Sequence, residues 1–144
     1  MINIESIEKV KKALETESAP RIVMSQNIQF NRALLEYGKF DILLYNLKCK
    51  KQDSLKQPDI HFNEALVKIA TKKNIALGFD SKEISALTQK EQAKELSRIR
   101  FLLSLCKKAK TCLVVLNAKD KHATQAFLIV LGASTQQAAA ALVF

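Results

Sequence analysis

The pattern of hydrophobic and polar positions switches several times between a helical and an extended period along this chain of 144 residues. Residues 4–16 place their aliphatic side chains on one helical stripe and are followed by Pro20, which predicts a helix. The short apolar run 21–25 predicts a strand. Asn27 and Gly38 then stand where the N-cap and the residue after the C-terminus of a second helix belong.

The same alternation continues through the rest of the chain. The apolar run 41–46 is continuous, which is typical of a strand covered on both faces. Residues 47–60 are polar and lysine-rich and predict a long loop, a common place for function. Further strands are expected at 74–79 and 111–117, and further helices at 62–73, 82–109 and 121–131 and after Ser134. A capping-box pattern at Thr88 and Glu91 divides the longest helix, and Ser134 and Gln137 form another.

Four strands that alternate with helices predict an α/β fold with a parallel sheet of βαβ units. Two arrangements are open at this point, a doubly wound sheet and part of a (β/α) barrel. The length predicts a single domain over residues 1–144.

The charge of the chain indicates a polyanionic partner. Lys and Arg number 23 against 14 Asp and Glu, which leaves a formal charge of +9. Such a surplus favours nucleic acid, with a solubilising surface as the alternative. Aromatic residues are few, which argues against a reader of single strands that stacks bases. No apolar run of about 18 residues and no signal-like N-terminus occurs, so we expect a cytoplasmic protein without membrane contact.

Motifs of catalytic chemistry are scarce. The two histidines, His61 and His122, lack metal-binding spacing, so we predict no metal site and no catalytic residue. Three glycines supply neither a P-loop nor a dinucleotide fingerprint. Cys106 and Cys112 fall on apolar faces and are interpreted as reduced core residues, although a cysteine nucleophile with a distant histidine stays open.

Basic clusters are the positive feature of the sequence. Lys48, Lys50 and Lys51 lie in the long loop, which leaves the carboxyl end of the sheet, where ligands bind in parallel α/β folds. Arg98 and Arg100 are about 200° apart on a helix, so one can face RNA while the other pairs locally. A basic run at 107–110 either faces RNA or complements the helix dipole, and the loop after the fourth strand adds another basic pair at 119 and 121.

An ordered series of short segments resembles the archaeal ribonuclease P protein called component 3, a family with archaeal and eukaryotic members. The series consists of Phe30-Asn31-Arg32, then Lys39-Phe40-Asp41-Ile42-Leu43, then Asp59-Ile60-His61-Phe62-Asn63, then the strand 74–77, Arg98 and Arg100, the strand 111–117, Leu131-Gly132 and Gln137-Ala138. It covers about residues 21–144. The family usually has a basic residue just before the aspartate that corresponds to Asp59. Here Gln57 and Pro58 stand there, with Lys56 and the Lys48 to Lys51 cluster upstream.

The resemblance implies a TIM-barrel-like fold related to that of PHP phosphoesterases. The first helix aligns with a later helix of the family, so the resemblance implies an N-terminally shortened, partial barrel with about four strands. Four strands are too few to close an eight-stranded barrel.

The resemblance also implies a function, in which this chain is a protein subunit of ribonuclease P and assists the catalytic RNA in removing 5′ leaders from precursor tRNA. The RNA component binds the Mg²⁺, so the chain itself needs no cofactor and is not expected to be catalytic alone. Its implied partners are the RNA, precursor tRNA and protein component 2, in a homodimer or heterotetramer. The implied RNA-binding residues are Arg32, Lys48, Lys50, Lys51, Lys56, Arg98, Arg100 and Lys121, and the structural ones are Asn31, Asp59 and Asn63.

Two other functions are compatible with an α/β fold. A metal-dependent phosphoesterase of the PHP type needs a metal cluster that two histidines do not supply. A generic α/β scaffold or small-molecule-binding protein would be indifferent to structured RNA at moderate salt.

Overall fold

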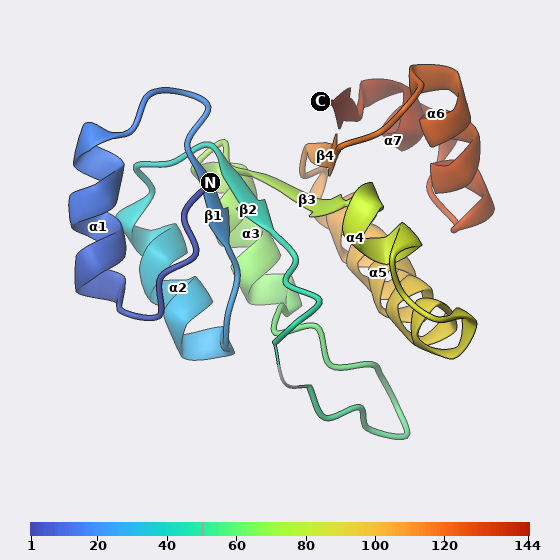
Figure 1. Ribbon diagram of the computed structural model, residues 1–144, viewed down its shortest axis with the longest axis horizontal. Coiled ribbons are helices and arrows are strands. Elements are labelled where there is room, and N and C mark those ends of the chain that lie inside the picture. Colours follow the sequence, from blue (N-terminus) through green and yellow to red (C-terminus); the bar gives the residue numbers. More distant parts are fainter. Residues whose placement is uncertain (50) are drawn as a thin grey trace.

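The computed structural model describes residues 1–49 and 51–144 and has one parallel sheet at its centre (Figure 1). Its five strands are β1 (Ile22–Met24), β2 (Ile42–Leu44), β3 (Ala76–Asp80), β4 (Leu113–Leu116) and β5 (Leu142–Val143). The helices are α1 (Ile7–Thr16), α2 (Ile28–Tyr37), α3 (Glu64–Lys72), α4 (Ser81–Ser85), α5 (Gln89–Ala109), α6 (Lys121–Val130) and α7 (Thr135–Ala140).

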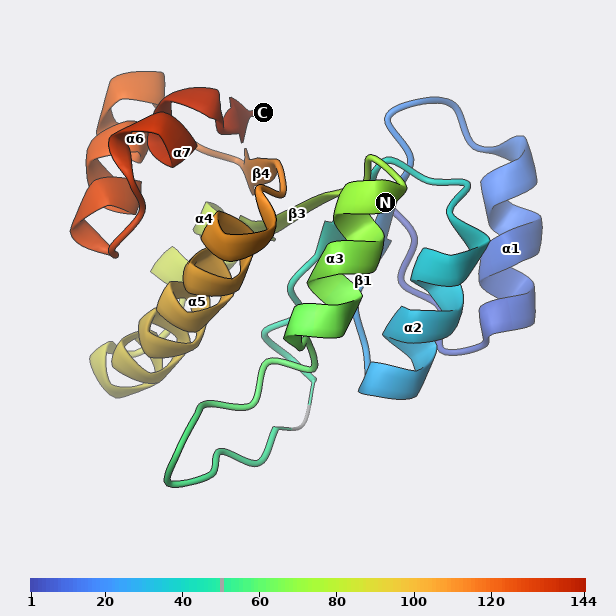
Figure 2. The same cartoon turned by 180° about the vertical axis from the view of Figure 1, so that it is seen from behind.

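The strands stand in the sheet in their order along the chain, and every pair is parallel. Because parallel crossovers are right-handed, this order keeps the connecting helices on one face. Helices α2, α3 and α5 lie on the near side of the sheet in Figure 2, and the opposite face is turned to the viewer in Figure 1. The prediction of an α/β fold with a partial TIM-barrel-like sheet is confirmed, and the arrangement is not doubly wound.

The sheet has one strand more than the sequence predicted. Strand β5 pairs with β4, with Leu142 opposite Val114 and Val143 opposite Val115. Two residues after an alanine-rich helix are too short to show any period, which is why the pattern missed them. The first helix begins at Ile7 instead of residue 4 because Ile2 bonds to β1 on both sides of Val23.

Local capping signals fix most of the other boundaries as predicted. The Asn27 side chain accepts a hydrogen bond from the Phe30 N–H at 2.8 Å, and Gly38 ends α2 in the left-handed conformation. The capping box of Thr88 and Glu91 is present and separates α5 from α4. The Ser134 side chain caps α7, but the Gln137 side chain donates to a carbonyl of α5 instead of completing its box.

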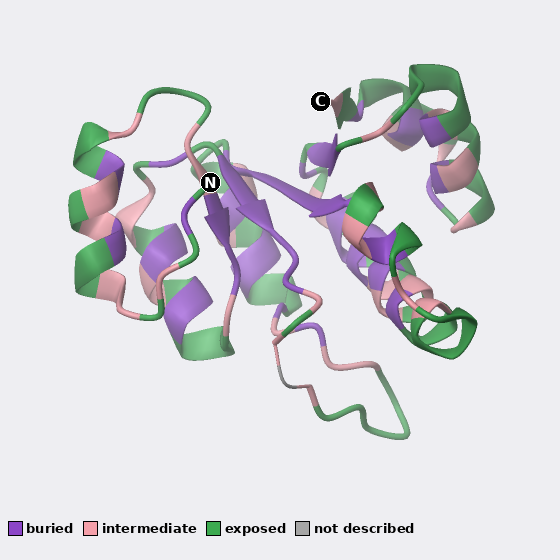
Figure 3. Cartoon of the chain, in the orientation of Figure 1, coloured by how far each residue is buried: buried purple, intermediate pink, exposed green. Residues whose placement is uncertain are grey.

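The strands of the sheet consist mostly of buried residues (Figure 3), and hydrophobic side chains form one cluster on each face of the sheet. The larger cluster lies between the helices and the sheet, and all three residues of β2 are buried, as its continuous apolar run predicted. The smaller cluster lies on the opposite face of the sheet, away from the helices. It consists of Met24, Ile42, Leu44, Ala76, Val114 and Leu116. Gly78 is required there, because a Cβ atom would collide with the Val114 carbonyl oxygen.

The cysteines differ in their surroundings. Cys106 is buried in the larger cluster, and burial raises the pKa of its thiol to about 12. Cys112 is exposed, so its interpretation as a core residue was wrong; it stands just before β4, where its side chain lies outside the hydrophobic layers. No helix in residues 1–49 and 51–144 is long and apolar enough to cross a membrane.

Candidate nucleic-acid interface

The long segment between β2 and α3 leaves the carboxyl-terminal edge of the sheet and projects away from the body of the molecule (Figure 1). It carries four of the five lysines among the implied RNA-binding residues. Since β1, β3 and β4 end at the same edge, the loops after these strands lie on the same side of the molecule. The candidate interface is therefore this edge together with the segment 45–63, which we call the long loop.

A buried hydrogen-bond network joins the long loop to helix α5. The Tyr45 hydroxyl donates to Glu95 at 2.5 Å, and the Arg98 guanidinium donates to the other Glu95 oxygen at 2.5 Å. Glu95 is buried with a side-chain exposure of 9%, and Arg98 places a positive charge beside its carboxylate. Burial and the bond to Glu95 raise the pKa of Tyr45 well above its ordinary value, which keeps the phenol protonated as the donor.

The same arginine holds the tip of the long loop. Its Nε and Nη2 atoms donate to the two carboxylate oxygens of Asp53 at 3.1 and 2.9 Å, a bidentate pair. The Arg98 side chain is only 13% exposed. The hydrogen bonds from Arg98 lower the pKa of the Asp53 carboxyl below its usual range, and the hydrogen bond from the Asp59 N–H lowers it further. Arg98 is thus an internal clamp in this structure.

Lys51 is also bonded inside the loop. Its ammonium donates to the carbonyl oxygens of Asn46, Leu47 and Cys49 at 2.7, 3.2 and 3.0 Å, so all three of its protons have acceptors. It lies 4.8 Å from the centre of the Tyr45 ring. Burial lowers its pKa. The lysine closes the turn after β2 and does not extend into solvent.

Asp59 accepts and donates hydrogen bonds within the long loop. Its carboxylate accepts from the Gln52 N–H at 2.8 Å and from the His61 N–H at 3.1 Å, and its own N–H donates to Asp53. Partial burial would raise its pKa, but these backbone donors and His61 outweigh that effect and lower it. Asp59 thereby joins the two sides of the loop, residues 52–53 and residues 59–61.

The two asparagines of the resemblance also make structural hydrogen bonds. Asn31 is fully buried and donates to the carbonyls of Gln26 and His61 at 3.0 Å each, which links the end of β1 to the end of the long loop. Asn63 caps α3, because its side chain accepts from the Leu66 N–H at 2.9 Å. Both positions therefore hold backbone in place.

The remaining predicted RNA-binding residues are exposed, namely Arg32, Lys48, Lys56, Arg100 and Lys121. Only Arg32 among these five forms an ion pair, with Glu36 on the surface of α2, and such a pair contributes little. Lys50 lies outside the described residues. The structure thus separates the predicted set into two internally bonded cations, Lys51 and Arg98, and five that solvent reaches.

Sequence reasoning missed the partners of the clamp, which are Tyr45, Asp53 and Glu95. One signal could have found Glu95: it stands four residues before Ile99 and seven before Leu102, on the stripe that α5 buries. A buried acidic side chain is normally paired with a cation, and Arg98 stands one helical turn away from Glu95. Asp53 is distant in sequence and carries no such signal.

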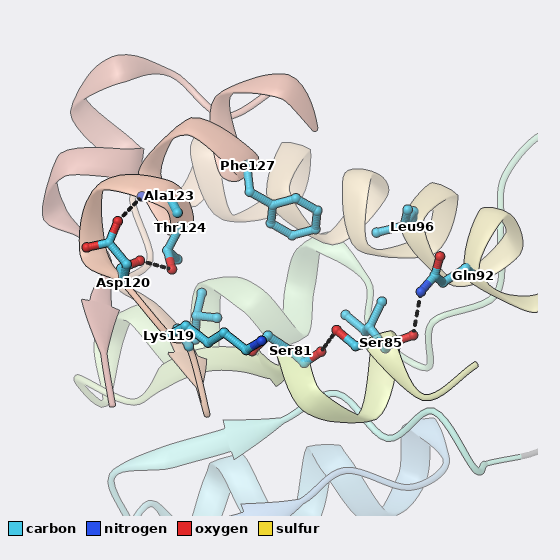
Figure 4. A pocket seen from close by; sticks show the side chains of 12 residues that line it. Ser81, Ser85, Gln92, Leu96, Lys119, Asp120, Ala123, Thr124 and Phe127 are labelled. Atoms are coloured by element: carbon cyan, nitrogen blue, oxygen red, sulfur yellow. Dashed lines mark hydrogen bonds between the residues drawn. The ribbon is translucent and has the colours of Figure 1, made fainter. Parts of the chain in front are cut away.

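A second feature of this edge is a cavity of about 280 Å³ between α4, α5 and α6. Its floor is apolar, with Leu96 and Phe127 turned inward, and Lys119 extends across it toward Ser81 (Figure 4). Asp120 instead caps α6 through the Ala123 N–H. In the described part of the chain, no group of three or more His, Cys, Asp or Glu side chains could hold a metal ion.

No known family model matches this chain, and no curated protein matches it. A solved structure does: a chain in the cryo-EM structure of archaeal ribonuclease P with mature tRNA has a TM-score of 0.70 and 20% sequence identity to this one. The likeness covers 95% of this chain and 60% of that chain. This chain therefore shares the fold of the archaeal chain and spans about 60% of its length.

Proposed function

We propose that this chain is a protein subunit of ribonuclease P, equivalent to component 3, and that it assists a catalytic RNA in removing 5′ leaders from precursor tRNA. The observation that carries the proposal is the likeness in fold to a chain of archaeal ribonuclease P over 95% of the present one. The ordered series of segments that resembles component 3 supports the choice of component. The positive charge of the chain is what an RNA partner requires.

Five exposed cations form the proposed RNA-binding surface, and each contacts phosphate. They are Arg32, Lys48, Lys56, Arg100 and Lys121. Lys51 and Arg98 act as positioning residues, because their hydrogen bonds fix the loop that presents Lys48 and Lys56. Phosphate contacts give affinity and register without reading sequence, which suits a protein that supports a folded RNA.

The open edge of the sheet at β5 is the proposed contact with protein component 2. Leu142 and Phe144 are 47% and 56% exposed there, and β5 has a single neighbouring strand. An exposed strand edge with apolar side chains is a surface that other chains pair with. Size-exclusion chromatography with light scattering, on the chain alone and mixed with component 2, distinguishes a homodimer from a heterotetramer.

Cleavage of precursor tRNA by a reconstituted particle tests the main proposal. The particle contains an archaeal ribonuclease P RNA and component 2, with or without this chain, at limiting Mg²⁺. We expect leader removal to depend on the chain and to recover at high Mg²⁺, because phosphate neutralisation by the protein replaces that by the metal. Cleavage that is identical with and without the chain would refute the proposal.

A variant separates RNA binding from folding in the same assay. The triple substitution Lys48→Gln, Lys56→Gln and Lys121→Gln removes exposed charges that form no ion pair among the described residues. It should reduce cleavage at limiting Mg²⁺ while leaving the unfolding midpoint unchanged. The control is Lys9→Gln with Lys12→Gln on α1, two exposed lysines outside the proposed surface.

The cavity between α4, α5 and α6 favours a second function, the binding of a small molecule by a protein unrelated to RNA. A cavity of about 280 Å³ with an apolar floor and one lysine is of the kind that holds a small anionic ligand. The filling substitution Ser85→Phe should leave RNA binding and cleavage unchanged if ribonuclease P is the function. Loss of a thermal shift by a small ligand in this variant would support the alternative.

A further inference from the structure

The positive charge of the chain is concentrated in two segments that the proposed RNA-binding surface hardly uses. Residues 65–79 and 96–116 together contain eight Lys and Arg and no Asp or Glu. The formal charge of the whole chain is +9, so these two segments account for nearly all of it. They comprise most of α3, strand β3 to Phe79, the second half of α5, and strand β4.

Five of the eight cations of these segments gather where α3 and α5 end, at the amino-terminal edge of the sheet. The carboxyl termini of the two helices point to the same side in Figure 2. The Thr71 hydroxyl bonds to the Ala109 carbonyl at 3.2 Å and lies 2.7 Å from the Thr111 hydroxyl, which joins the two helix ends directly. The lysine cluster at this end consists of Lys72, Lys73, Lys107, Lys108 and Lys110.

All five lysines of the cluster are exposed. No carboxylate in the described part of the chain forms an ion pair with any of them, although Lys68 one turn earlier is paired with Glu64. The side chain of Lys73 lies against Gly38, which gives its stem a fixed support. A cavity of about 180 Å³ opens between the helix ends and is lined by Lys110, Thr71, Thr111 and Asn74 among others. The end of the molecule thus combines unpaired cations with hydroxyl and amide groups.

We propose that the lysine cluster is a second RNA-binding surface, which holds the phosphate backbone of a structured RNA at the edge of the sheet opposite the long loop. The inference rests on the proposed function only for which RNA is bound. A chain with phosphate contacts at both edges bridges two RNA segments, or two turns of one RNA, and so holds them at a fixed separation.

The side chains around the cluster fit RNA better than a protein partner. Protein interfaces are depleted in lysine and depend on buried aromatic or aliphatic anchors. None of the exposed large hydrophobic residues falls in 65–79 or 96–116; they are Met1, Ile28, Leu55, Ile129, Val130, Leu142 and Phe144. Phosphate contacts need only cations, hydroxyls and amides, which is what the cluster supplies.

Stabilisation of the helix termini is the competing explanation for these lysines. Lys72, Lys107 and Lys108 stand in the last turns of α3 and α5, where cations offset the helix dipole. Lys73 and Lys110 follow the helices, so the helix dipoles account for only three of the five lysines. The dipole explanation predicts an effect of substitution on stability alone, whereas the RNA surface predicts an effect on the salt dependence of binding.

The test measures binding of the full chain to a short RNA duplex of arbitrary sequence and to an archaeal ribonuclease P RNA, as a function of salt. The variant carries Lys72→Gln, Lys73→Gln, Lys107→Gln and Lys108→Gln. Each lost phosphate contact lowers the magnitude of the slope of log affinity against log salt by about 0.9 on a duplex, so we expect the loss of four contacts to reduce it by about 3.6. The control removes charge away from both edges through Lys9→Gln and Lys12→Gln on α1, and should change the slope much less for each charge removed.

Two further measurements make every outcome decisive. The same four positions changed to Arg should keep the slope, which separates loss of charge from loss of fold. An unchanged slope in the Gln variant, or an equal fall for each charge removed in the control, overturns the inference. Binding of a polyglutamate peptide that competes with RNA at equal charge concentration also overturns it, in favour of an acidic protein partner. Since the duplex assay contains neither ribonuclease P RNA nor component 2, its result is independent of the cleavage assay above.

Discussion

At the carboxyl-terminal edge of the sheet, Arg98 and Lys51 donate hydrogen bonds to oxygen atoms of the protein itself. At the amino-terminal edge, the five lysines of the cluster have no carboxylate partner in the described residues. The two edges therefore use positive charge differently. At the first edge, Arg98 and Lys51 fix the path of the long loop and only the remaining cations are available to a ligand, whereas at the second edge all five lysines are available. The difference teaches that the number of cations near a site is a poor guide to how many can bind phosphate.

The largest expected effect is at the buried part of the clamp. Glu95→Ala removes the acceptor of Tyr45 and Arg98 and leaves a mostly buried guanidinium with one partner. Breaking a buried pair from one side costs about 3 to 5 kcal/mol, so we expect a loss near the lower end in urea unfolding. Glu64→Ala, which breaks the exposed pair with Lys68, is the control and should cost about 0.5 kcal/mol or less. Equal losses would mean that the clamp is no stronger than a surface pair.

A smaller, local effect is expected at the exposed end of the clamp. Asp53→Ala removes the bidentate partner of Arg98 and the acceptor of the Asp59 N–H. The long loop should open more often, with hydrogen exchange in residues 51–59 roughly tenfold faster, equivalent to about 1.4 kcal/mol. Ser54→Ala breaks a bond inside the loop tip and should leave its attachment to α5 intact. Unchanged exchange in Asp53→Ala would show that Arg98 does not hold the loop.

Acid should release the same contact without a mutation. The folded-state pKa of Asp53 lies below its ordinary value because of Arg98, so the contact stabilises fully above the unfolded pKa of about 3.9. That stability is lost as the pH falls through the lower folded pKa, while Arg98 stays protonated. The chemical shift of the Asp59 amide, which donates to Asp53, should move between neutral pH and pH below 4 in the native chain and move much less in Asp53→Ala, where Asp59 is the remaining bonded carboxylate of the loop. A shift change in both chains alike would assign the transition to another group.

The smallest effect is expected from a single lysine of the other edge. Lys107→Gln should lower the free energy of unfolding by about 0.5 kcal/mol, because a cation in the last turn of α5 offsets the helix dipole. Its RNA salt slope should also fall, by about 0.9. Lys94→Gln near the start of the same helix is the control and should not destabilise. A stability loss with no change in slope would assign Lys107 to the dipole alone.

Much of the fold was predictable, because local signals at particular residues set it. Asn27 and Gly38 bounded α2, and Thr88 with Glu91 separated α4 from α5. The helix start at Ile7 and the strand β5 were not predictable, since both depend on pairing with a distant strand. Of the site, the sequence singled out Asn31, Asp59 and Asn63, and each of them makes hydrogen bonds to backbone groups. The burial of Arg98 and Lys51 depends on contacts that sequence spacing does not encode.

The sequence by itself determined the alternation of strands and helices, the excess of positive charge and its confinement to segments free of acids, because periodicity and composition are properties of the chain. Only the tertiary structure decided the strand order and the pairing of Arg98 with Asp53, which is 45 residues away. It also brought the ends of α3 and α5 together through Thr71 and Thr111. Whether a cation is bonded internally or reaches solvent depends on which distant oxygen atoms folding places beside it.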